Sequence, residues 1–129
     1  MSRYGAQFGP DVTFLGVPPC DLSDPSTYAG ADIVILGAPF DGGTSHRAGT
    51  RFGPRAIRTT DYLGHDGSRP SLALRVDGLR DLRGLDAGDV MMPPGHIEAF
   101  IGPVPVARAD VRGVVAFPVV LGEDNSIAY

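Results

Sequence analysis

The chain has 129 residues, which suggests one domain, and hydrophobic and charged shares of 43% and 20% favour a packed core over wholesale disorder. The formal net charge of −4 argues against a nucleic-acid binder, because phosphate binding needs a clustered basic surface. The N-terminus has no apolar run long enough for a secretory signal or a membrane span. Cys20 is the only cysteine, which excludes an intrachain disulfide, and we expect a cytoplasmic protein.

The first segment of the chain lacks the pattern of a regular element. Residues 1–31 are rich in Gly, Pro, Ser and Asp, and Pro18, Pro19 and Pro25 remove backbone donors and restrict the residues before them. We therefore predict an extended N-terminal arm over 1–31, packed on the domain or on a neighbouring subunit, and an α/β domain over 32–129.

A first strand is predicted immediately after the arm. Ile33 to Leu36 is an unbroken apolar run bounded by Asp32 and Gly37, and such a run suits a strand that is covered on both faces in a parallel sheet. A glycine-rich loop follows the strand.

A helix is predicted from Pro54, because proline is tolerated at the first helical position, and it should run to about residue 63. In this helix we expect Ala56 and Ile57 to face inward. Arg55 and Arg58 should lie nearer to solvent.

Residues 72–76 alternate between larger apolar and other side chains, which is a strand signal, and Asp77-Gly78 is a good tight-turn pair. A short strand is predicted over 82–86 and a loop over 87–94.

A helix begins near residue 96, but Gly102-Pro103 and Pro105 interrupt it before helical spacing resumes over 104–115. The last strand is predicted over 119–121. The order of strand, loop, helix, hairpin, strand, broken helix and strand predicts an α/β sandwich with a parallel sheet.

The glycine-rich loop lies at the carboxyl end of a strand, where α/β proteins bind ligands. It contains neither a P-loop nor a GxGxxG fingerprint. Two interpretations stay open. The loop is a structural turn whose arginines pair with acids, or it is a small-anion site held by Arg47, Arg51 and Arg55.

Asp86 and Asp89 follow the next strand, and two carboxylates at this spacing bind a cation or, more often, serve a turn or a helix cap. The histidines stand at no metal-ligand spacing with each other or with Cys20. We read Cys20 as an inert small residue, because no partner pattern for a nucleophile surrounds it.

Three stretches in order, "GAPFDGGTSHRAGTRFGPRAIR", "LDAGDV" and "PVVLGEDNSIAY", resemble the arginase/agmatinase (ureohydrolase) family. The first stretch is more similar to the agmatinase branch than to arginase. The likeness covers most of residues 14–129 and is weakest over 96–117. It implies a three-layer α/β/α sandwich around a mostly parallel sheet, usually assembled as trimers or hexamers. This chain would hold an incomplete, truncated ureohydrolase fold.

The same resemblance implies hydrolysis of a guanidino compound such as agmatine to urea and an amine, by two Mn²⁺ ions that activate a bridging hydroxide. In the family, histidine and aspartate ligands hold the metals, and the first is the histidine of a GGDHS motif. This chain reads GEDNS over 122–126, so the neutral Asn125 stands at the ligand position with Asp124 beside it. The motifs DAHxD and DxDxxDP, which carry the remaining ligands, do not occur in the 129 residues.

With no intact ligand of the family's set, we expect the chain to be inactive alone and not to retain Mn²⁺. Two alternatives stay open: a non-catalytic or regulatory chain that assembles with a full-length ureohydrolase as a homo- or hetero-oligomer, and a small-anion binder. If a catalytic remainder lies on another chain, Asn125 and Asp124 would stand at the metal edge. The residues that would line the substrate side are Asp41, Thr44, Ser45, His46 and Arg47.

Overall fold

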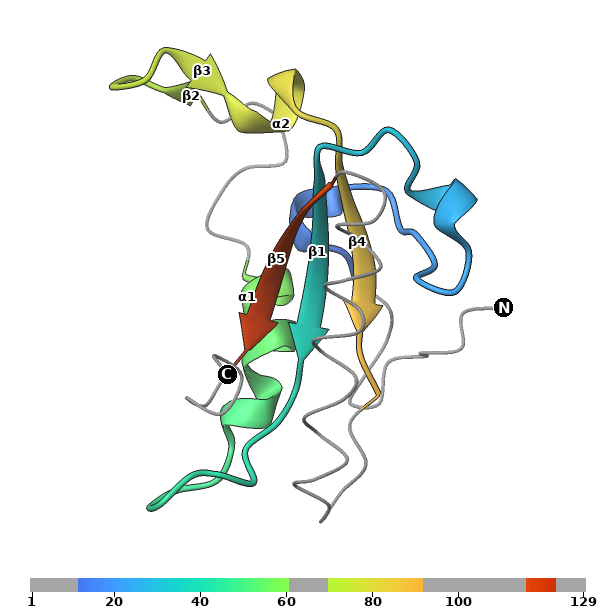
Figure 1. Ribbon diagram of the computed structural model, residues 1–129. Helices are drawn as coiled ribbons and strands as arrows, with labels where there is room; N and C mark the ends of the chain where they lie inside the picture. Colours follow the sequence, from blue (N-terminus) through green and yellow to red (C-terminus); the bar gives the residue numbers. More distant parts are fainter. Residues whose placement is uncertain (1–11, 61–69, 92–115, 123–129) are drawn as a thin grey trace.

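The structure is a computed structural model of the 129-residue chain, and it describes residues 12–60, 70–91 and 116–122. Within these ranges the chain forms an α/β unit around a small parallel sheet (Figure 1). The predicted helices over 96–101 and 104–115 lie outside the described residues. Among the described residues, no helix is both long enough and apolar enough to cross a membrane.

The central sheet has three parallel strands in the order β4-β1-β5, with β1 spanning Ile33–Ala38, β4 Gly84–Asp89 and β5 Phe117–Gly122. β1 and β5 pair without a break from Ile33 opposite Phe117 to Ala38 opposite Gly122. The β1–β4 pairing shifts register between Ile35 and Gly37. The predicted parallel sheet, its first strand and its last strand are confirmed, and each strand is longer than the apolar run that predicted it.

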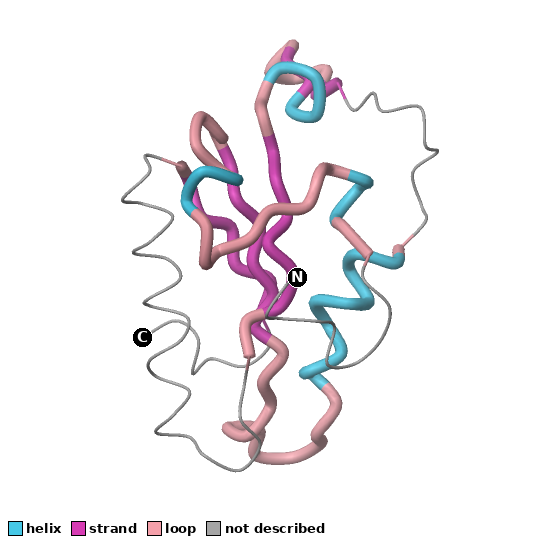
Figure 2. Tube along the Cα trace, turned by 90° about the vertical axis from the view of Figure 1, so that its right-hand side faces the viewer, coloured by secondary structure: helices cyan, strands magenta, loops and turns pink. Residues whose placement is uncertain are grey.

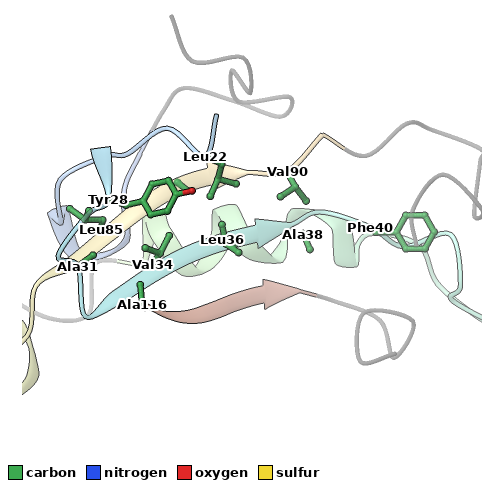
Figure 3. Packing of buried hydrophobic residues seen from close by; sticks show 11 residues of the cluster. Leu22, Tyr28, Ala31, Val34, Leu36, Ala38, Phe40, Leu85, Val90 and Ala116 are labelled. Carbon is green, nitrogen blue, oxygen red and sulfur yellow. The ribbon is translucent and has the colours of Figure 1, made fainter. Parts of the chain in front are cut away.

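The two faces of β1 pack against different partners. Val34, Leu36 and Ala38 point to one face, where they join a buried cluster that includes Leu22 and Tyr28 from the segment before β1 (Figure 3). Because side chains alternate along a strand, Ile33 and Ile35 point to the other face. Helix α1 (Gly53–Thr59) lies along that other face (Figure 2). The short apolar run of β1 is therefore covered on both sides, as its composition predicts.

The segment before β1 is held against the sheet. It contains two 3-10 helices, η1 (Phe14–Gly16) and η2 (Pro25–Thr27), and Asp24 caps η2 by accepting from the Ser26 amide. Between them, Pro19 forms an isolated parallel bridge with Asp86 at the outer edge of β4. The division of the chain into an arm over 1–31 and a domain over 32–129 stays a prediction.

The region between α1 and β4 differs from the prediction. A hairpin of β2 (Pro70–Ser71) and β3 (Val76–Asp77) has its turn at residues 72–75, which were predicted to be extended. Asp77-Gly78 is not a tight hairpin turn. Asp77 instead caps the short helix α2 (Gly78–Asp81), and its carboxylate accepts from the Leu79 amide at 3.2 Å. β4 then begins at Gly84, two residues later than predicted.

The predicted start of α1 is confirmed, because Pro54 stands in its first turn, but its orientation was predicted wrongly. Ala56 and Ile57 are exposed, and Arg58 is buried. The helix ends at Thr59, where the Thr59 and Thr60 hydroxyls donate to backbone carbonyls one turn earlier. The reason for the reversed orientation is a buried ion cluster beneath the helix.

Candidate functional site

The loop that follows β1 is organised around one carboxylate. Asp41 accepts from the Gly49 amide at 2.7 Å through Oδ2 and from Arg51 Nη1 at 3.2 Å and 3.1 Å through its two oxygens. The Thr44 hydroxyl donates to the Asp41 carbonyl at 2.7 Å. Gly49 has a φ of 135°, which a residue with a Cβ rarely adopts. The loop is therefore closed by its own hydrogen bonds, with Asp41 at the centre.

The charge of Asp41 is stabilised inside this loop. Burial raises the pKa of the Asp41 carboxyl, but hydrogen bonds from the Gly49 amide and from Arg51, with the attraction of the Arg51 charge, more than offset it. The pKa consequently lies below its usual value of 3.8. The Arg51 guanidinium also lies 4.9 Å from the centre of the Phe52 ring, which holds it over the loop.

The five residues predicted for the substrate side fall into two groups. Asp41 and Thr44 are partly buried and hydrogen-bonded within the loop. Ser45, His46 and Arg47 are exposed at its tip. The loop extends beyond the carboxyl ends of the strands (Figure 1). For Arg51, the interpretation as a structural turn is confirmed, because its charge is committed to Asp41.

A buried ion cluster made of Arg58, Asp86 and Asp89 joins α1 to the end of β4; we call it the Arg58 cluster. Arg58 Nε and Nη2 donate to the two oxygens of Asp86 at 2.9 Å each, which is a bidentate pair. Its Nη1 donates to Asp89, and Nη2 also donates to the Gly88 carbonyl at 3.1 Å. The side chains of Arg58 and Asp86 are 4% and 0% exposed.

The Asp86 carboxylate of the cluster also accepts hydrogen bonds from the backbone. Asp86 accepts from the Phe14 amide at 2.7 Å and from the Gly88 amide at 2.8 Å. Burial lowers the pKa of Arg58, but the hydrogen bonds and charges of Asp86 and Asp89 more than compensate, so the net shift is upward. Arg58 therefore stays charged and holds η1, α1 and β4 together.

A glycine makes room for the cluster at the end of β1. A Cβ built on Gly37 would collide with the Asp89 carboxylate and lie 2.9 Å from Arg58 Nη1. The Val90 amide donates to the Gly37 carbonyl at 2.8 Å, which ties the residue after β4 to β1. The carboxyl edge of the sheet is thus fixed by a glycine and a buried charge network.

This geometry decides the role of the two aspartates. The sequence left Asp86 and Asp89 open between a cation site and, more often, a turn or a helix cap, and in the structure both carboxylates accept from Arg58. In the described parts of the chain, no group of three or more His, Cys, Asp or Glu residues could hold a metal ion. Sequence reasoning missed Arg58, although its spacing of four from Pro54 puts both on one helix face, and both are buried.

The remaining predicted site residues follow β5. The last pair of the β1–β5 ladder is Ala38 with Gly122, so β5 ends at the same edge of the sheet as the loop after β1. Asp124 and Asn125 come two and three residues later and lie outside the described residues. Cys20 is half-buried against the core cluster that contains Val34 and Leu36. Burial and then the charges of Asp86 and Asp21 raise the pKa of its thiol from 9.0 to about 11.

Comparisons with known proteins agree with this geometry. A model of the arginase family matches residues 31–129. The chain is 37% identical over 123 residues to formimidoylglutamase of Halobacterium salinarum. It is 35% identical over 130 residues to proclavaminate amidinohydrolase of Streptomyces clavuligerus and 35% identical over 116 residues to agmatinase of Pyrococcus horikoshii. These matches cover 95%, 98% and 88% of this chain but only 36%, 38% and 37% of the relatives.

Solved structures share the fold. The chain superimposes on a hypothetical agmatinase from Burkholderia thailandensis with a TM-score of 0.76 at 24% identity, over 95% of this chain and 36% of that one. The TM-score is 0.60 at 30% identity with formiminoglutamase of Trypanosoma cruzi, whose crystal structure contains a Mn²⁺ pair, over 89% of this chain and 37% of that one. The chain spans little more than a third of the length of these proteins.

Proposed function

Because the chain belongs to the arginase family, we propose that it is the N-terminal part of a metal-dependent ureohydrolase that hydrolyses a guanidino compound to urea and an amine. The observation that carries the proposal is the family match over residues 31–129, in which β1, β4 and β5 end at one edge of a parallel sheet. In open parallel sheets, ligands bind at that edge.

Each described element has a place in this proposal. The Arg58 cluster fixes the ends of β1 and β4, so that the loops which follow them start from rigid positions. Asp41 holds the loop after β1 in shape through Gly49 and Arg51. We assign Ser45, His46 and Arg47 at the tip of that loop, with Asp41 and Thr44 behind them, to the substrate side.

The described residues do not fit a two-metal centre by themselves. Asp86 and Asp89 are committed to Arg58, and the described ranges hold no other acid or histidine cluster of ligand type. We place Asp124 and Asn125 at the metal edge on the strength of their motif position alone. The neutral amide of Asn125 is a weaker metal donor than an imidazole, and we expect the chain alone to bind Mn²⁺ weakly and to release no urea.

We favour agmatine or a related guanidino amine as substrate, because the loop after β1 resembles that of agmatinases. The relatives of similar identity are named for different reactions, namely formimidoylglutamase, proclavaminate amidinohydrolase and agmatinase. The substrate test must therefore include several guanidino and formimidoyl compounds.

A second candidate function is that of a non-catalytic partner. Among the described residues, β5 has no strand on its outer side, and β1 lies on its inner side. An open parallel edge is suited to receive a strand from another polypeptide. In this reading the chain assembles with a full-length ureohydrolase and changes its assembly or activity.

A chimera tests the main proposal. Residues 31–129 of this chain replace the matching segment of the Pyrococcus horikoshii agmatinase, once unchanged and once with Asn125→His. We expect the His chimera to bind Mn²⁺ and release urea from agmatine, and the unchanged chimera to be at least tenfold less active.

The 129-residue chain alone, loaded with Mn²⁺ and dialysed, serves as the reference for metal content and urea release. Folded chimeras that release no urea from any guanidino compound in either version would refute the proposal. Copurification of the unaltered chain with the full-length agmatinase, without a gain in urea release, would favour the non-catalytic partner instead.

A further inference from the structure

The sheet face on which α1 lies is covered only in part by the described residues. α1 lies toward the carboxyl ends of the strands, where Arg58 reaches β4 (Figure 1). At the amino ends, an apolar pocket of about 730 Å³ lies between η1, α2 and the sheet. Ile33, Ile35 and Val119 line this pocket from β1 and β5. We call it the η1–α2 pocket.

Exposed apolar side chains continue the surface of the pocket. Leu15 and Leu82 line it and are 37% and 44% exposed. Phe117, which is 68% exposed, stands two residues before Val119 on β5 and therefore points to the same face of the sheet. Parallel strands are normally covered on both faces, yet no residue of β5 is fully buried. Among the described residues, β5 therefore lacks a covering element on this face.

The lining of the pocket does not suit a small polar ligand. Among the described lining residues, only Thr27 and Arg83 carry polar side-chain atoms. The Thr27 hydroxyl donates to backbone carbonyls of its own segment, and Arg83 Nη1 donates to the Ala29 carbonyl at 2.7 Å. A pocket for a small molecule normally directs a few polar groups at its ligand to fix the orientation. The η1–α2 pocket is instead typical of an apolar contact between polypeptide segments.

The direction of the chain crossovers indicates which kind of segment can cover this face. In Figure 1 the strands point downward and β4 stands to the right of β1, while α1 lies behind the sheet, so the crossover from β1 through α1 to β4 is right-handed. Crossovers between parallel strands are almost always right-handed. A helix on the α1 face therefore belongs to a connection that moves in the direction from β5 to β4. A segment that covers this face beside β5 must accordingly return from strands that lie beyond β5.

We propose that the η1–α2 pocket and the outer border of β5 form one docking surface for the part of a ureohydrolase that follows the segment shared with this chain. We call that part the complementary part. The matches leave more than three fifths of each relative outside the shared segment, so it is large enough to supply both strands and helices. An apolar helix of the complementary part returns toward β5 and fills the pocket, and a strand pairs with β5. The proposal rests on the proposed function, in which this chain is the N-terminal part of a ureohydrolase.

This partner differs from a full-length ureohydrolase. A full-length relative contains its own copy of the shared segment, so its complementary part already has a surface on which to pack. It would have to give up that contact before it could bind this chain. A complementary part without its own copy has no such competing contact, and we therefore expect it to bind more tightly.

Thiol labelling of two matched proteins tests the proposal. One is the 129-residue chain, and the other is a chimera in which the whole chain replaces the segment that it matches in the amidinohydrolase of Streptomyces clavuligerus. Both carry Cys20→Ala, and each receives either Leu82→Cys at the pocket or, as a control, Arg80→Cys, whose side chain is 72% exposed. We expect a maleimide to label the Leu82→Cys thiol about tenfold or more slowly in the chimera than in the chain, because reagent access to it is blocked. The Arg80→Cys thiol should be labelled at similar rates in both.

Circular dichroism checks that each protein has kept its fold, and mass spectrometry identifies the labelled residue. Equal labelling of Leu82→Cys in the two folded proteins would overturn the proposal. Slow labelling in the chain alone would also overturn it, because this chain or a second copy would then already cover the pocket. Urea release is not part of this readout, so the docking surface and the proposed function can fail separately.

Coexpression gives a second test that does not need the chimera to fold. The complementary part of the same amidinohydrolase is coexpressed with the tagged 129-residue chain and, as a positive control, with its own matching segment. We expect copurification in both cases. The pocket variant Leu79→Glu with Leu82→Glu should lose the partner, and the hairpin variant Leu72→Asp with Leu74→Asp should retain it. A complementary part that copurifies with its own segment but not with this chain would overturn the proposal, and so would its retention by the pocket variant.

Discussion

Replacing Arg58 by methionine should destabilise the chain severely, although methionine keeps much of the aliphatic stem. The change removes the bidentate pair with Asp86 and the contact with Asp89, and it leaves a fully buried carboxylate. Breaking a buried ion pair from one side costs about 3–5 kcal/mol. Asp86 keeps the amides of Phe14 and Gly88, so we expect the lower end, about 3 kcal/mol of unfolding free energy.

A loss of this size is a large fraction of the roughly 5–15 kcal/mol that stabilises a typical domain. Urea unfolding followed by circular dichroism measures it, and the thermal midpoint should fall by roughly 10 °C. Arg55→Met is the matched control, since it changes the same residue type in the same helix at a half-buried position. We expect the control to lose less than about 1 kcal/mol.

The buried carboxylate is the physical cause, which a second change can isolate. Asp86→Asn in the Arg58→Met background should cost less than Asp86→Asn alone, with a coupling of about 1–3 kcal/mol. Equal unfolding free energies of the Arg58→Met and Arg55→Met variants would show that the Arg58 cluster does not hold the fold in the way described. Simple additivity of Arg58→Met and Asp86→Asn would show the same.

Three further outcomes can be checked. Gly37→Ala should unfold the chain or lower its stability by about 3 kcal/mol or more, because the new methyl would overlap the Arg58 cluster. Gly84→Ala is the control. Its Cβ would lie 3.7 Å from the nearest neighbouring atom, and the change should cost about 1 kcal/mol or less. Asp41 has a lowered pKa in the folded state, so the stability that it adds is present above its ordinary pKa of 3.8 and is lost as the pH falls through the folded-state pKa. A series of unfolding midpoints against pH should show an acid-sensitive component that Asp41→Asn removes. An acid profile that this substitution leaves unchanged would contradict the prediction. Cys20, with a pKa of about 11 against 9.0, should react with a disulfide reagent at pH 8 about a hundredfold more slowly in the folded chain than in urea, and equal rates would contradict its burial.

The strands could be predicted from the sequence because their signal is local. The apolar run from Ile33 to Leu36 predicts a strand covered on both faces, and β1 is almost wholly buried. The apolar run from Val119 to Leu121 likewise predicted a strand, but the described residues of β5 are only partly buried or exposed. Pro54 likewise marks the start of α1 through a property of its own ring. The order of these elements was sufficient to predict the parallel sheet.

The inward face of α1 could not be predicted in the same way. A seven-residue helix is too short for its periodicity to define one face, and polarity alone assigns Arg58 to solvent. Its partners stand 28 and 31 residues later in the chain, so only the fold brings them together. The Asp77-Gly78 pair shows a similar limit, since the same dipeptide suits a hairpin turn and a helix cap.

The outer border of β4 is already paired at Asp86, in the middle of the strand. The Cys20 amide donates to the Asp86 carbonyl at 2.9 Å, and the Asp86 amide donates to the Pro18 carbonyl at 3.0 Å, while the two neighbouring prolines have no N–H to offer to a further strand. Within the described residues, β5 has no pairing on its outer side, so it is the more open border of the central sheet. Open-ended growth of a sheet by edge pairing needs two open borders on every molecule. A chain of this kind can add a strand beside β5. If the added strand belongs to a polypeptide whose other border is also bridged, the growth of the sheet ends with that addition.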